Sequence, residues 1–164
     1  MNFKMKIIFT SILLSLAAVL FSFKNYTEKS PYKCMIQMKN YSGEGAYVVI
    51  SLINPKDEYE ETLFVQGKDD EWYFDIPKWW RYQGKKRDNI DAITGATISG
   101  GERSVCVIEI DHTKLDKGYK VRFESAVEDR KYYKDDVEFE LTLENLSSKI
   151  EGRGFIRYVR MMPQ

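Results

Sequence analysis

The sequence predicts an all-β protein, an antiparallel immunoglobulin-like or fibronectin-like β-sandwich of about seven strands with one short helix. Three observations lead to this class. Apolar and polar residues alternate over most of the chain, turn-forming residues separate the alternating runs, and 164 residues suffice for one domain. We expect a leader at residues 1–24 and a single sandwich domain at residues 25–164.

The leader has the layout of an export signal or an N-terminal anchor. Residues 1–6 are basic, residues 7–23 form an unbroken run of apolar and small side chains, and the chain becomes polar at Lys24. The run is slightly shorter than the ~20 residues that span a bilayer. We therefore expect an exported protein, either periplasmic or anchored to the membrane and facing outward.

The strands are expected in order along the mature chain, each ended by a turn. Gly43-Glu44-Gly45 and Asn54-Pro55-Lys56-Asp57 are two such turns. In residues 118–128 apolar side chains alternate with charged ones such as Arg122 and Glu124, which we expect at solvated strand faces. The expected strands are residues 33–41, 46–54, 61–66, 104–110, 118–128, 137–144 and 154–161.

Residues 71–86 break the alternation. Pro77 suits the first turn of a helix and Gly84 suits its end, so we expect a short helix over residues 77–83 lying on the sandwich. Its many aromatic side chains cannot all be buried on so small an element. Either they cap an open end of the core, or Trp79, Trp80 or Tyr82 offers a stacking face to a planar ligand.

Charge and isolated polar residues argue against several classes of function. Lysine plus arginine and aspartate plus glutamate each number 25, so the chain lacks the net basic charge typical of nucleic-acid binding. The single histidine, His112, lies in a polar turn with no serine nucleophile placed beside it. The acidic residues 69–71 lack the spacing of a calcium loop, and no metal site is expected. We expect an electron carrier or a binding module rather than an enzyme.

The two cysteines, Cys34 and Cys106, each lie in an alternating run with apolar neighbours on the same face. Both are therefore expected to point inward. In an oxidising compartment they form either a buried disulfide or two packed thiols, and the spacing does not decide between the two.

The segment DNIDAITGATISGGE, residues 88–102, carries three glycines and few large side chains. Gly95 allows backbone angles closed to other residues, and Ala96 keeps the neighbourhood narrow. Thr94 and Thr97 supply hydroxyls that suit an anion such as phosphate. Either the segment is a glycine-rich turn, or its backbone and the hydroxyl of Ser99 are reached by another molecule.

Residues 91–99, DAITGATIS, resemble the D-x-x-[ST]-G-A-[ST]-x-[ST] signature of proteins with covalently attached FMN. These include the FMN-binding subunits of sodium-translocating NADH:quinone reductase and of the Rnf complex. Asp91 occupies the acidic position, Thr94-Gly95-Ala96-Thr97 the central four, and Ser99 the acceptor position, where threonine is commonest. The resemblance implies that an FAD:protein FMN transferase joins FMN to Ser99 through a phosphodiester.

A second resemblance covers most of residues 46–128, through Trp79-Trp80-Arg81 and the run from Asp91 to Thr97. It is to a predicted-periplasmic, Ig-like domain family of unknown function whose members tend to be encoded beside flavin transferases and membrane redox proteins. It implies an extracytosolic flavin-carrying electron-transfer protein with a membrane-bound redox partner. The alternative is a non-redox module that binds a partner or ligand, with the Gly-Ala-Thr segment as a structural turn.

Overall fold

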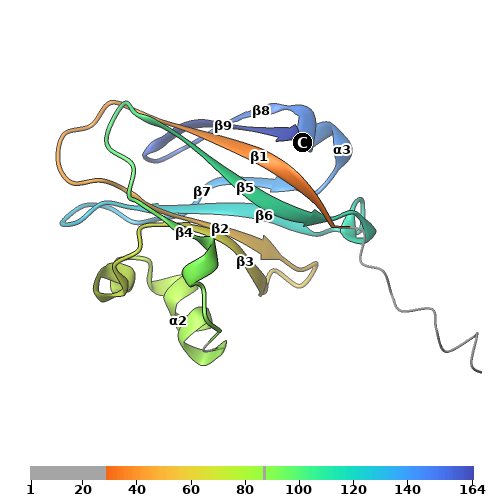
Figure 1. The fold of residues 1–164 in the computed structure, drawn as a ribbon, viewed down its shortest axis with the longest axis horizontal. Coiled ribbons are helices and arrows are strands. Elements are labelled where there is room, and N and C mark those ends of the chain that lie inside the picture. The colour runs from red at the N-terminus through yellow and green to blue at the C-terminus, as the bar shows by residue number, and fades with distance from the viewer. Residues whose placement is uncertain (1–28, 87) are drawn as a thin grey trace, which may run out of the picture.

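The chain forms a two-layer β-sandwich in the computed structural model, which describes residues 29–86 and 88–164 (Figure 1). One sheet has four strands in the order β5-β1-β9-β8, and the other has five in the order β4-β3-β2-β6-β7. The expected all-β sandwich is therefore confirmed. The leader expected at residues 1–24 lies outside the described residues.

Seven of the nine described strands correspond to the alternating runs of the sequence, whereas the short strands at residues 94–95 and 149–151 were not predicted. The four-stranded sheet contains β5 (Arg103–Asp111), β1 (Lys29–Met38), β9 (Ile156–Pro163) and β8 (Lys149–Glu151). The five-stranded sheet contains β4 (Thr94–Gly95), β3 (Tyr59–Gln66), β2 (Tyr47–Ile53), β6 (Lys120–Ala126) and β7 (Tyr133–Glu140). Neighbouring strands are antiparallel except β3 and β4, which pair in parallel through Val65 and Thr94.

Short helical elements connect the strands. They are η1 (Asp70–Asp75), α2 (Pro77–Lys86), η2 (Asp91–Ile93), η3 (His112–Lys114) and α3 (Leu143–Ser147). Among the helices in the described part of the chain, none is long and apolar enough to cross a membrane.

The main core lies between the two sheets and contains both cysteines. Cys34 on β1 lies directly opposite Cys106 on β5, and both side chains are buried, as predicted. In this structure they are free thiols. A hydrogen bond with the Cys106 thiol and burial raise the pKa of the Cys34 thiol well above its ordinary value.

A second, smaller core covers the outer face of the five-stranded sheet. Figure 1 shows η1 and α2 lying beneath that sheet, and Trp79 and Ile76 are fully buried there against Val49. Because this face is covered, the interior strand β6 is buried on both sides. Arg122 and Glu124, which we expected in water, are only 2% and 0% exposed. That expectation was wrong.

Several element boundaries also differ from the prediction, two of them at helices. The helix does not stop before Gly84 but continues to Lys86. The strand expected over residues 137–144 ends at Glu140, because the hydroxyl of Thr142 accepts a hydrogen bond from the Asn145 N–H and begins α3. Leu143, which continued the alternating pattern, is consequently 60% exposed.

Candidate functional site

The segment from η2 to β5 closes one end of the sandwich by crossing from one sheet to the other (Figure 1). It first lies beside β3 as β4, and Ile98 then pairs with Ala46 through two backbone hydrogen bonds of 2.7 and 3.0 Å. A turn at Gly100 and Gly101 leads into β5. The segment is therefore held at both ends and in its middle.

Ser99 lies where this segment leaves the core. Ile98 before it is only 3% exposed, whereas Ser99 itself is exposed. The Ser99 N–H donates to the Glu102 carboxylate at 3.3 Å, and the Ser99 carbonyl accepts from the Glu102 N–H at 3.1 Å. Within the described residues the Ser99 hydroxyl has no hydrogen-bond partner, so it is open to an incoming group.

The glycines of the segment have two different roles. Gly101 has a φ of +79°, and a Cβ on Gly100 would lie 2.1 Å from the Tyr41 carbonyl oxygen, so both positions of the turn require glycine. Gly95 was expected to use backbone angles closed to other residues, but its φ is not positive. Its role is spatial instead, since a Cβ there would lie 3.1 Å from an oxygen of Gln66.

A cavity of about 620 Å³ lies between η1, α2 and η2 and brings together three of the predicted residues, Trp80, Asp91 and Thr94. Thr94 donates its hydroxyl to the Asp91 carbonyl at 3.1 Å. The volume falls within the range of small-molecule sites. The lining residues are Lys68, Asp70, Tyr73, Trp80, Gln83, Gly84, Asp88, Asn89, Ile90, Asp91 and Thr94.

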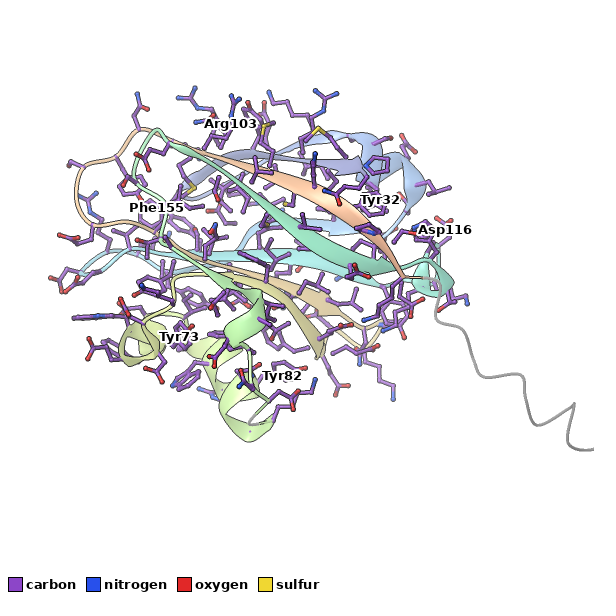
Figure 2. The ribbon with its side chains drawn as sticks, viewed as in Figure 1. Tyr32, Tyr73, Tyr82, Arg103, Asp116 and Phe155 are labelled. Carbon is purple, nitrogen blue, oxygen red and sulfur yellow. The ribbon has the colours of Figure 1, made fainter. Side chains whose placement is uncertain are left out.

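The three aromatic candidates of α2 have different environments. Trp79 is fully buried and donates its indole N–H to the Thr62 hydroxyl at 2.9 Å, so its ring offers no stacking face to a ligand and that expectation is corrected. Tyr82 is partly buried, stacked on Tyr59 with ring centroids 5.3 Å apart. Trp80 is 37% exposed. The Tyr82 hydroxyl donates to the Glu60 carbonyl of β3 at 2.6 Å, and Figure 2 labels Tyr82 on α2 below the five-stranded sheet.

A second, smaller hollow of about 200 Å³ lies beside Thr97. Tyr47 and Trp72 supply its aromatic wall, and Gly45 faces the Thr97 side chain so closely that a Cβ would lie 2.4 Å from the Thr97 hydroxyl oxygen. Ala96, like Thr97, is exposed. The hollow also has an acidic rim, formed by Glu44, Asp69 and Glu128.

The structure therefore divides the predicted site residues into two groups. Trp80, Asp91 and Thr94 line the larger cavity, whereas Thr97 lines the smaller hollow and Ser99 follows it after the buried Ile98. Sequence reasoning missed Tyr47 as a wall of the smaller hollow, since only the fold brings it near Thr97. In the described part of the chain no group of three or more histidine, cysteine or carboxylate side chains is arranged to hold a metal ion.

A family model described as a predicted periplasmic protein, DUF2271, matches residues 29–158. The chain belongs to this family. The DUF2271 description agrees with the export expected from the leader and gives no activity. The matched range includes every candidate residue from Trp79 to Ser99, so both hollows and the exposed serine lie within the family domain. Neither the curated proteins nor the solved structures contain a match to the chain.

Proposed function

We propose that this periplasmic protein is a flavin carrier in which FMN is attached to Ser99 through a phosphodiester bond. The observation that carries the proposal is the exposed Ser99 hydroxyl, which has no partner among the described residues and stands at the acceptor position of DAITGATIS. The neighbouring Ile98 is buried, so a group on Ser99 would be fixed close to the body of the sandwich.

The attachment reaction requires no general base from this chain. The Ser99 oxygen attacks the FMN-side phosphorus of FAD, the bond from that phosphorus to the bridging oxygen breaks, and AMP leaves. An FAD:protein FMN transferase would accept the serine proton. After attachment, the Ser99 N–H, which here donates to the Glu102 carboxylate, and the hydroxyl of Thr97 would be available as donors to the phosphate. FMN would supply the electron-transfer chemistry, and the chain would supply its position and electrostatics.

The smaller hollow, rather than the larger cavity, is the neighbour of Ser99 along the chain. The flavin ring would therefore lie toward Tyr47 and Trp72, while Trp80 lines the other cavity. The three carboxylates that line this hollow would disfavour the anionic form of a reduced flavin bound there, and would therefore lower its reduction potential. A membrane-bound redox protein would be the electron-transfer partner.

Intact-mass measurement tests the proposal. We expect the exported protein, coproduced with an active FAD:protein FMN transferase, to gain the mass of FMN less water. Ser99→Ala should abolish the gain, whereas Ser147→Ala, an identical change at an exposed serine of α3 outside the motif, should retain it. An unmodified mass, with a known acceptor protein modified in the same cells, would contradict the proposal. It would favour a ligand-binding module instead, for which the larger cavity is the supporting observation.

A further inference from the structure

We propose that the larger cavity, between η1, α2 and η2, binds a small organic cation with an amine or guanidinium group against the indole of Trp80. This site is distinct from Ser99 and does not depend on flavin attachment. Its shape, one glycine in its wall and its charge each point to a ligand.

The aromatic wall of the cavity is fixed from behind. Tyr73 is 3% exposed and donates its hydroxyl to the Gly67 carbonyl at 2.9 Å. Its ring meets the Trp80 ring edge to face, with centroids 5.3 Å apart, and both residues line the cavity. Because Trp80 is itself 37% exposed, part of its indole remains available to a ligand. Tryptophan is the best aromatic partner for a cation.

Gly84, one helical turn after Trp80, leaves space in the α2 wall of the cavity without a structural need for glycine. It lies within α2, where glycine is less favourable than alanine. Its φ is not positive, and a Cβ at this position would meet no atom within 4 Å. Neither backbone conformation nor packing requires glycine there. The absence of a side chain at position 84 enlarges the cavity. This extra space would favour glycine there if a ligand occupies the cavity.

The charge of the lining selects a cation. Three carboxylates line the cavity, and Lys68 is its only described cationic residue. Asp88 forms an ion pair of 3.0 Å with Lys86, which does not line the cavity. Asp70 and Asp91 form no ion pair with any described residue. The groove beside Tyr82, also on α2, has the opposite charge, because three cationic residues and one carboxylate line it. They are Lys78, Arg81, Lys85 and Glu58.

The loop that carries two of these carboxylates is tied to the helix. Gln83 is only 4% exposed, and its amide N–H donates to the Asp88 carbonyl at 3.0 Å while its amide oxygen accepts from the Thr62 hydroxyl at 3.1 Å. The start of the loop is therefore held in place before a ligand arrives, which reduces the entropy lost on binding.

Isothermal titration calorimetry of the purified protein tests the charge requirement. Putrescine and agmatine are the probes, and 1,4-butanediol is the neutral match to putrescine. We expect both amines to bind in the micromolar to millimolar range, to change tryptophan fluorescence, and to do so equally in Ser99→Ala. The butanediol should not bind. No heat from either amine at millimolar concentration, or equal binding of the diol, would overturn the proposal.

Variants test the location. Gly84→Leu should abolish amine binding without lowering the thermal midpoint, because leucine is the better helix former. Asp91→Asn should weaken binding about fivefold. The control is Asp116→Asn, an identical change that Figure 2 places at the far end of the molecule from Tyr73. Unchanged amine binding in either cavity variant would overturn the assignment. Equal weakening of amine binding in the Asp116→Asn control would also overturn it. If Gly84→Leu does not fold, the affinity of Asp91→Asn decides alone.

Discussion

Replacing Glu124 by glutamine is expected to stabilise the protein above neutral pH and to change its stability little near pH 4. Glu124 is fully buried on β6, where the Tyr59 hydroxyl donates to one carboxylate oxygen at 2.7 Å and the Tyr132 hydroxyl donates to the other. The nearby Arg122 is paired with Asp57 and Glu138 instead. Burial raises the pKa of Glu124 to about 7, although the two hydroxyls, Arg122 and Lys134 act in the opposite direction.

The sign of the effect follows from the raised pKa. The folded state holds the proton up to about pH 7, whereas the unfolded chain releases it near the ordinary value of 4.5. Stability from the protonated Glu124 is therefore fully present below pH 4.5 and is lost as the pH rises through 7. The difference between the two pKa values corresponds to about 3 kcal/mol, at ~1.36 kcal/mol per pH unit.

Urea unfolding, followed by tryptophan fluorescence from pH 4 to pH 8, measures this difference. Glutamine keeps an oxygen acceptor for one tyrosine and removes the titration. The free energy of unfolding of Glu124→Gln, minus that of the unaltered protein, should rise by about 3 kcal/mol across the range. An exposed control, Asp116→Asn, should show no comparable rise. A difference for Glu124→Gln that stays constant with pH would refute the reasoning.

One treatment and three substitutions have definite expected outcomes. Oxidation of the opposed thiols of Cys34 and Cys106 should lower the protein mass by two hydrogens. It should raise the free energy of unfolding by up to ~4 kcal/mol, because the disulfide would close a long loop. An unchanged free energy of unfolding in urea after confirmed oxidation would contradict this. Asp136→Ala should lower the free energy of unfolding by ~3 kcal/mol or more, since the buried carboxylate accepts hydrogen bonds from one hydroxyl and two backbone N–H groups. A urea midpoint equal to that of the unaltered protein would argue against these hydrogen bonds. Gly67→Ala should lower the free energy of unfolding by ~2 kcal/mol or more, because φ is +120° and a Cβ would overlap the Tyr47 ring. Gly84→Ala should instead raise it by up to ~1 kcal/mol, because alanine is the better helix former. Calorimetric melting of both variants checks that the two changes have opposite signs.

Period-two alternation was enough to predict the sandwich, because most strands have one face in the core and one outside. It failed on β6, where the second core covers the outer face and buries Glu124. A local pattern cannot show that a helix lies on the far side of a strand. The continued alternation of leucines through Leu143 was also misleading, since the capping hydroxyl of Thr142 starts a helix at that point.

The candidate site was partly predictable. The DAITGATIS motif predicted an accessible Ser99, and the structure shows that residue exposed. Helical spacing separates Trp79 from Trp80, because Trp79 shares a buried face with Gln83 four residues later. Choosing which face is buried requires knowing where α2 docks. The walls that η1 and β2 supply to the two hollows depend entirely on contacts between distant parts of the chain.

The backbone pairing of Ile98 with Ala46 limits how far any group attached one residue later can travel. The polypeptide would contribute little more than rotation about the serine side-chain bonds to the freedom of such a group, because the peptide on its N-terminal side is hydrogen-bonded to Ala46, just before β2. The protein therefore supplies no swinging arm of its own, and the reach of the group would be set by its own chain. Electron exchange would then require each redox protein in turn to approach the same closed end of the sandwich.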